Sequence, residues 1–256
     1  MKKIYISVVS HNHEKIIKEI NCLPNLSKDF TVVLKSNIEE KIADYCSQHG
    51  IIHLTSTIPL GFGENNNSIF HYCKEKLGMD KKDYFIILNP DVDITSESIE
   101  KLILHMTHDN ASFTTINLYR DYNFQAHDYS IRYFPKLSDF IFSFIGLKNK
   151  TKIEKEKITI PCSVDWAAGS FLAFRVDMFE KIGGFNPKYF MYCEDIDICL
   201  RLKNIDCSLI YYPNITAVHL AQHKNRNIFS KHFFWHVKSS MLYLIEKAKY
   251  DFKKIN

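Results

Sequence analysis

The chain has 256 residues, of which 46% are hydrophobic and 24% charged, the composition of an ordinary globular protein. Its formal net charge of +4 is too small to indicate a nucleic-acid partner, but it suits an anionic substrate or an anionic membrane surface. The sequence has no secretory signal, no Cys-x-x-Cys pair among its seven cysteines, and no apolar stretch near the roughly 20 residues of a spanning helix. We therefore expect a cytoplasmic protein with reduced thiols.

Strand and helix patterns alternate through the first 110 residues. Such alternation indicates an open, mostly parallel α/β sheet with helices on both faces. The fourth strand is entirely apolar, which predicts a central position. The predicted strands are 3–10, 30–34, 51–54 and 84–88, and the predicted helices are 16–23, 38–48, 65–77 and one that starts at Thr95 or Ser96.

The second half of the chain is less regular. Short strand-like pieces between 113 and 162, with a polar aromatic stretch at 119–129, predict a mobile region. No linker separates the two halves, so we predict a single domain over residues 1–256. The later predicted elements are strands at 170–174 and 208–212 and helices at 177–182, 195–203 and 228–254.

Polar clusters follow three of the predicted strands, at the edge where open parallel sheets bind ligands. In Asp91-Val92-Asp93, two carboxylates on an extended segment repel each other unless a cation lies between them, and hard oxygen ligands favour Mn²⁺ or Mg²⁺. A solvated turn before a helix is the alternative. The other two clusters are Ser10-His11-Asn12 and Lys35-Ser36-Asn37.

A glycine–asparagine block, Gly61-Phe62-Gly63-Glu64-Asn65-Asn66-Asn67, precedes the third helix. It is not a dinucleotide fingerprint, because Asn66 stands where that motif needs its third glycine. The asparagines either bind a ligand or form an ordinary polar helix start.

Acidic residues gather at Glu194-Asp195-Ile196-Asp197, where a helix is predicted to begin. Acids at a helix start interact favourably with the helix dipole, which is one explanation; a general base facing a pocket is the other. His219 follows the last predicted strand, with His223 four residues later, and either completes a metal site or is an ordinary histidine.

Three blocks together resemble the family 2 glycosyltransferases of GT-A fold, in particular the rhamnosyltransferase-like branch that builds bacterial surface polysaccharides. They are the run from Val164 through Trp166 and Gly169 to Phe171, Gly183-Gly184-Phe185-Asn186, and the run from Phe190 to Arg201. The Asp-x-Asp and glycine–asparagine blocks match in order, so the resemblance covers residues 4–245. It implies a Rossmann-like central sheet flanked by helices, with a nucleotide-sugar half at 1–110, an acceptor half at 111–227 and a terminal helix at 228–256.

The resemblance also implies an activity. An acceptor hydroxyl would attack the anomeric carbon of a dTDP-, UDP- or GDP-linked sugar with inversion, and a nucleotide diphosphate would leave. The acceptor would be a glycan or a polyprenyl-diphosphate-linked saccharide, as in the synthesis of O-antigen, capsule or lipopolysaccharide. Bound Mn²⁺ or Mg²⁺ would offset charge on the departing diphosphate.

Family roles are carried over to the matching positions. Asp195 would be the general base, supported by Glu194 and Asp197, although Asp197 and Arg201 are also spaced as an i, i+4 helix pair. Asp91, Asp93 and His219 would bind the metal. Contacts to the nucleotide-sugar would come from Ser10, Asn12, Lys35, Asn37, Gly61, Phe62, Asn66, Asn67 and Asp91, and Trp166 and Gly169 would line the sugar and acceptor site.

Two positions depart from the family pattern. Lys35-Ser36-Asn37 stands where an Asp usually holds the nucleobase, and Asn186 replaces the Asp after Gly-Gly-Phe. The alternative function is therefore a degenerate homologue that binds a nucleotide or glycan without transferring sugar.

The segment from Ile228 to Lys254 combines aromatic residues with six lysines. It either packs on the core or rests on an anionic membrane, as a peripheral contact on the inner face of the plasma membrane.

Overall fold

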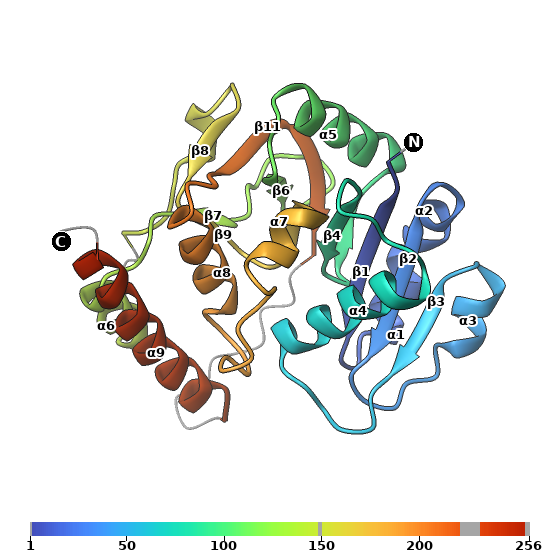
Figure 1. Ribbon diagram of the computed structural model, residues 1–256, viewed down its shortest axis with the longest axis horizontal. Helices are drawn as coiled ribbons and strands as arrows, with labels where there is room; N and C mark the ends of the chain where they lie inside the picture. The colour runs from blue at the N-terminus through green and yellow to red at the C-terminus, as the bar shows by residue number, and fades with distance from the viewer. Residues whose placement is uncertain (1, 148–149, 221–230, 254–256) are drawn as a thin grey trace.

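The computed structural model describes residues 2–147, 150–220 and 231–253. Within these ranges, nine strands form one sheet in the order β3-β2-β1-β4-β10-β6-β11-β5, with β8 paired to β11 (Figure 1). The strands are β1 Ile4–Ser10, β2 Thr31–Ser36, β3 Ile52–Thr55, β4 Tyr84–Leu88, β5 Val92–Asp93, β6 Phe113–Tyr119, β8 Cys162–Val164, β10 Phe171–Arg175 and β11 Leu209–His219, and β7 Ile131–Arg132 pairs separately with β9 Trp166–Ala167.

The helices of the described residues cover both faces of this sheet (Figure 1). They are α1 Glu14–Ile20, α2 Leu23–Asp29, α3 Ala43–Gln48, α4 Phe62–Lys76, α5 Ser96–His108, α6 Leu137–Phe144, α7 Val176–Lys181, α8 Glu194–Lys203 and α9 Lys231–Lys253, with a short 3₁₀ turn at Lys155–Lys157.

The first four strands of the sheet run parallel, as predicted. The second half is mixed, because β10 is antiparallel to both β4 and β6 while β11 is parallel to β6. The apolar strand β4 lies between β1 and β10 and is buried throughout, as its sequence predicted. Strands from both halves of the chain therefore share one sheet.

Alternating side chains divide the core into two clusters, one on each face of the sheet. On β4, Phe85 and Ile87 pack on the face covered by α4, α7 and α8, whereas Ile86 and Leu88 pack on the face covered by α1, α2 and α5. This period-2 alternation is the ordinary geometry of a strand buried on both sides.

Several predicted boundaries differ from the structure. The first helix ends at Asn21, whose left-handed φ of 53° stops it, and α2 follows as a separate helix that we did not predict. Helix α3 begins at Ala43 rather than residue 38, and α4 begins at Phe62 rather than residue 65. The predicted helix 228–254 is observed as α9; residues 228–230 and 254 lie outside the described residues.

The strand predicted at 208–212 is longer in the structure. β11 continues to His219, with a register shift against β6 between Tyr212 and Thr216. This extra length carries the strand across the end of the sheet to β5. The segment 113–162, expected to be mobile, supplies the central strand β6 and helix α6; its mobility stays a prediction.

Candidate active site

A sharp turn at the end of β4 carries the Asp-x-Asp block. Asp91 lies in this turn, and Val92 and Asp93 form β5 against the end of β11. Val92 pairs with His219, and the Leu220 amide donates to the Asp91 carbonyl at 2.9 Å. The sheet therefore brings together two segments that are more than a hundred residues apart.

His219 lies between two carboxylates. Its Nε2 is 3.3 Å from Oδ1 of Asp91, and its Nδ1 is 2.7 Å from Oδ2 of Asp128. Burial lowers the pKa of His219, but hydrogen bonds and charge from Asp128 and Asp91 outweigh burial and raise it to about 9. Burial likewise raises the pKa of each carboxyl, and His219 reverses this, so both pKa values are lowered.

This cluster offers two ligands for a divalent cation. Oδ1 of Asp91 is buried, and the polar atom that lies beside it is Nε2 of His219 at 3.3 Å. A carboxylate suits Mn²⁺ or Mg²⁺ when a substrate supplies the remaining oxygens, and an imidazole ligand favours Mn²⁺ over the harder Mg²⁺. Among the described residues, no three His, Cys, Asp or Glu side chains are gathered closely enough to hold a metal by themselves. The residues present fit a metal whose coordination a bound diphosphate completes.

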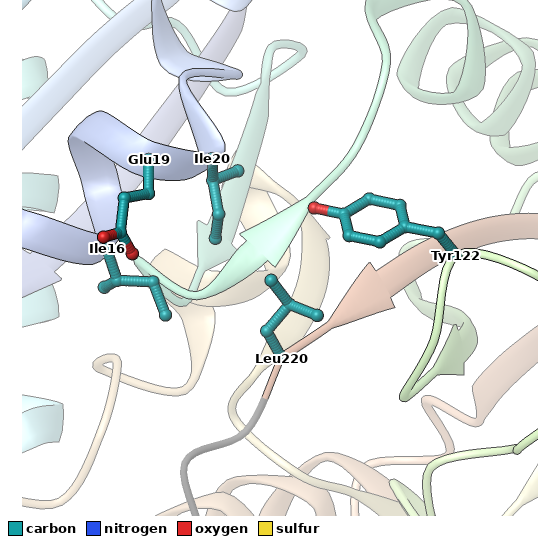
Figure 2. Close-up of a pocket in the computed structure, with 5 residues that line it drawn as sticks. All are labelled: Ile16, Glu19, Ile20, Tyr122 and Leu220. Atoms are coloured by element: carbon teal, nitrogen blue, oxygen red, sulfur yellow. The ribbon is translucent and has the colours of Figure 1, made fainter.

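Asp93, the second carboxylate of the block, lies near Tyr122. Burial and the charge of Asp93 raise the pKa of the Tyr122 phenol. Tyr122 also lines a pocket with Ile16, Glu19 and Ile20 of α1 and with Leu220, the neighbour of His219 (Figure 2). Asp93 as a metal ligand stays a prediction.

Asp195 occupies the first turn of α8. Its Oδ2 accepts from the Gly169 amide at 3.3 Å, and its Oδ1 accepts from the Ile196 amide at 2.8 Å. Burial raises the pKa of Asp195, and burial together with the charge of Asp195 raises the pKa of Glu194. A carboxyl with a raised pKa is a better proton acceptor than an exposed one, as a general base requires.

The segment 166–170 connects these two acidic groups. The Asn89 amide, next to the Asp-x-Asp block, donates to the carbonyl of Ser170, while the Gly169 amide donates to Asp195. In addition, the positive charge of Arg132 contributes to lowering the pKa of Asp128 and partly opposes the rise that burial gives the pKa of Asp195. Both the histidine cluster and the candidate base therefore interact with the charge of Arg132.

The asparagines of the glycine–asparagine block are engaged inside the protein. Asn66 accepts from the Ser7 hydroxyl at 2.7 Å and donates to the Phe62 carbonyl at 2.9 Å. Asn67 donates to the carbonyl of Phe185 and accepts from its amide. These hydrogen bonds give Asn66 and Asn67 a structural role, and their role in donor binding stays a prediction.

The backbone of Gly61 and Phe62 packs closely against Phe190, in the segment before α8. A Cβ at Gly61 would lie 2.3 Å from the Phe190 carbonyl oxygen, and the Phe62 amide donates to the same oxygen. A Cβ at Gly169 would lie 2.8 Å from the Phe62 ring. These positions shape the site through backbone packing; a direct contact with the sugar donor stays a prediction.

Most of the polar residues at the ends of β1 and β2 also form hydrogen bonds within the protein. Ser10 donates to Glu40 at 2.7 Å, and the buried Lys35 donates to Ser68 on α4 at 2.9 Å. Asn37 exchanges two hydrogen bonds with the backbone of Leu60. Of the four predicted donor contacts here, only Asn12 is exposed, with a left-handed φ of 65°.

Asp197 has its own buried partner. It forms an ion pair with Arg201 at 2.7 Å, and Arg201 also donates to the carbonyls of Ile182 and Gly184, each at 2.8 Å. This is the i, i+4 helix pair that the sequence offered as the alternative to a supporting role in catalysis. Through Arg201, Asp197 connects α8 to the Gly183-Gly184 turn. Trp166 is 9% exposed, and its indole N–H donates to the Tyr133 carbonyl; its place in the lining of the sugar and acceptor site stays a prediction.

Asp128 and Arg132 were not among the predicted site residues. Asp128 lies within the polar aromatic stretch at 119–129, and Arg132 follows it by three residues. This stretch is the sequence signal that could have indicated them. Their contacts depend on the β6–β11 pairing, which brings Asp128 to a histidine 91 residues later.

Comparisons with known proteins agree with this fold. A family model described as the N-terminal domain of galactosyltransferase matches residues 149–224. The chain is 42% identical to Rhamnosyltransferase WbbL of Escherichia coli strain K12, over 95% of this chain and 93% of that protein. It is 27% identical to the dTDP-rhamnosyl transferase RfbF of Shigella flexneri, over 88% and 71%.

Solved structures share the fold at lower identity. GalNAc-T7 with UDP, GalNAc and Mn²⁺ superposes with a TM-score of 0.57 at 14% identity, covering 90% of this chain. Staphylococcus aureus TarS 1–349 in complex with UDP-GlcNAc also superposes with a TM-score of 0.57, at 11% identity and 88% coverage. This chain spans 46% and 60% of those two chains.

The fold and these matches define the class of protein: it is a glycosyltransferase with a GT-A fold. Within that class, the identity over nearly the full length of WbbL shows that the chain belongs to the rhamnosyltransferase-like glycosyltransferases.

The structural role of Asp197 can be tested by stability. In Asp197→Ala, the largely buried Arg201 loses its counter-ion, so we expect the free energy of unfolding to fall by about 3–5 kcal/mol. Urea unfolding followed by circular dichroism measures this. Lys101→Ala, which removes an exposed i, i+4 pair with Glu97, is the control and should leave the midpoint unchanged. An unchanged midpoint for Asp197→Ala would remove the structural assignment.

Proposed function

We propose that this glycosyltransferase is an inverting, Mn²⁺- or Mg²⁺-dependent enzyme of surface polysaccharide synthesis. It takes a sugar from a dTDP-, UDP- or GDP-linked donor and transfers it to a glycan or a polyprenyl-diphosphate-linked acceptor. The observation that carries the proposal is that the Asp91–His219–Asp128 cluster and Asp195 lie at the same end of the sheet, where Leu88 at the end of β4 pairs with Phe171 at the start of β10.

The donor's diphosphate would lie against Asp91 and His219. A bound divalent cation would neutralise charge as the nucleotide diphosphate departs. Asp128 accepts a hydrogen bond from Nδ1 of His219, which leaves Nε2 directed at Asp91. A carboxylate behind a ligating histidine fixes the ring orientation and its tautomer, so Asp128 acts here as a positioning residue.

Asp195 would act on the acceptor. Its carboxylate, held by the Gly169 and Ile196 amides, removes the proton as the acceptor oxygen bonds to the anomeric carbon. Glu194, buried and with a raised pKa, limits the negative charge beside Asp195.

The relatives support the substrate class: WbbL is named a rhamnosyltransferase, and RfbF a dTDP-rhamnosyl transferase. We place the protein at the inner face of the plasma membrane, where lipid-linked acceptors are found.

Asp195→Asn should lower kcat for transfer roughly 10²- to 10⁴-fold, because the amide cannot take the proton. Transfer from dTDP-rhamnose and from UDP- and GDP-sugars, with Mn²⁺ present, is measured by release of the nucleotide diphosphate. Asp44→Asn, on the exposed side of α3, is the control. Wild-type protein that binds a donor without turning it over would favour the degenerate homologue instead.

The pH dependence follows from the burial of Asp195. A base must be ionised, and burial raises its pKa above the value of about 4 of an exposed aspartate. The acidic limb of kcat/KM should therefore lie at a higher pH than an exposed carboxyl would give. Glu194 and Asp195 have raised pKa values, so they bind protons more tightly in the folded protein than in the unfolded chain. Protonating these two carboxyls therefore does not unfold the protein. An acidic limb near pH 4 would contradict the assignment.

Asp128→Asn should weaken the binding of Mn²⁺ in the presence of a nucleotide diphosphate about 10- to 100-fold. The asparagine keeps the shape of the side chain but no longer holds His219 as a carboxylate does. Mn²⁺ electron paramagnetic resonance measures free and bound ion without any turnover. Asp121→Asn, in the same loop but without contact to His219, is the matched control. Equal Mn²⁺ affinity in Asp128→Asn and wild type would exclude the positioning role.

A further inference from the structure

Exposed apolar side chains are concentrated on α6, the residues just after it, and α9. Among the described residues, seventeen large hydrophobic side chains are exposed, and eight of them lie within 137–147 and 231–253. Monomeric proteins seldom leave such a concentration uncovered unless it binds something. The eight are Leu137, Ile141, Ile145, Leu147, Phe234, Met241, Ile245 and Phe252.

Packing between the two helices leaves these side chains on the outside. The ring of Phe140 lies 5.9 Å from that of Tyr243, and the ring of Phe144 lies 5.5 Å from that of Phe233. These contacts use the inner faces of α6 and α9, which lie side by side at one end of the molecule (Figure 1). The outer faces form what we call the α6–α9 surface.

Lysines are interleaved with the apolar residues on α9. Phe234, Met241, Ile245 and Phe252 follow one another at intervals of seven, four and seven, which is one face of a helix. Lys231, Lys238 and Lys249 lie three or four residues from these positions and are exposed on the same side. With five lysines against Glu246 and Asp251, α9 has a net charge of +3.

We propose that the α6–α9 surface binds the interface of an anionic lipid bilayer. An apolar stripe bordered by lysines suits this environment, because the rings and aliphatic chains enter the acyl boundary while the ammonium groups extend to lipid phosphates. A second copy of the same face would instead bring like charges together. No helix in the described ranges is long and apolar enough to cross a bilayer.

The surface connects directly to the candidate active site. On α9, Ser239 donates to the Met191 carbonyl at 2.8 Å, and Trp235 packs on Phe190 with ring centroids 4.8 Å apart. Both partners immediately precede the first turn of α8, which carries Asp195. Membrane docking would hold the acceptor side of the site near the bilayer, where a polyprenyl-linked substrate presents its saccharide. The functional consequence rests on the proposed function; the binding itself does not.

Vesicle co-sedimentation of the full chain tests the binding. Wild type should sediment with phosphatidylcholine vesicles that contain phosphatidylglycerol, should not sediment with phosphatidylcholine alone, and should be released by salt. The double variant Phe234→Asp, Ile245→Asp should bind at least tenfold more weakly. Leu104→Asp, at a 70% exposed leucine on α5, is the matched control and should bind like wild type.

Three outcomes overturn the proposal: no sedimentation of wild type with anionic vesicles, an equal loss in Leu104→Asp, or a dimer in light scattering that only the double variant breaks. The last would assign the surface to a second copy of the chain. Circular dichroism of each variant verifies that it folds.

Sugar transfer to a soluble acceptor analogue separates the two proposals. The double variant should retain this activity while losing activity on the same acceptor embedded in anionic vesicles. Wild type that binds vesicles but never turns over a donor would refute the proposed function alone, and wild type active on both acceptors without binding vesicles would refute the docking surface alone.

Discussion

The contact of one imidazole with two carboxylates organises one half of the candidate active site. Asp91 and Asp128 lie on opposite sides of His219, and all three side chains are less than one-fifth exposed. Two carboxylates so little solvated would repel each other, and the cost of burying them is offset by positive charge between them. A proton on His219 provides that charge, as its raised pKa indicates; a divalent cation beside Asp91 would supply the same compensation. The length of β11, the turn after β4 and the loop after β6 all serve to build this contact.

The other half of the candidate active site has the opposite electrostatic arrangement. Glu194 and Asp195 are adjacent carboxyls at the start of α8, and burial raises both pKa values instead of lowering them. Arg132 is positioned where its charge acts on Asp195 and on Asp128 alike. At one end of the sheet, Asp91 and Asp128 therefore have lowered pKa values and stay ionised, whereas Glu194 and Asp195 have raised pKa values and accept protons more readily. This difference is what a transfer reaction needs if a diphosphate leaves from one side and a proton from the other.

The sequence predicted those features that local patterns determine. The apolar run Tyr84–Leu88 placed a central strand, and the position of Asp91 directly after it followed from the sheet rule. Asp128 was not predictable, because its role comes from a contact across 91 residues through two paired strands. The internal hydrogen bonds of Asn66 and Asn67 were not predictable either. An amide has the same composition whether it faces a ligand or a backbone, and here Phe62 and Phe185 provide the partners.

The loop before α8 explains why the second half of the chain resists prediction from local pattern. Tyr192 and Cys193 adopt left-handed φ values of 69° and 64°, which residues with a Cβ seldom adopt without support. That support is tertiary: Phe62 and Gly61 contact Phe190 from one side, and Trp235 and Ser239 of α9 hold the same loop from the other. The position of Asp195 therefore depends at once on the glycine–asparagine block and on the terminal helix. Gly61, through its close approach to Phe190, and helix α9, through Trp235 and Ser239, therefore both shape the geometry of the candidate base.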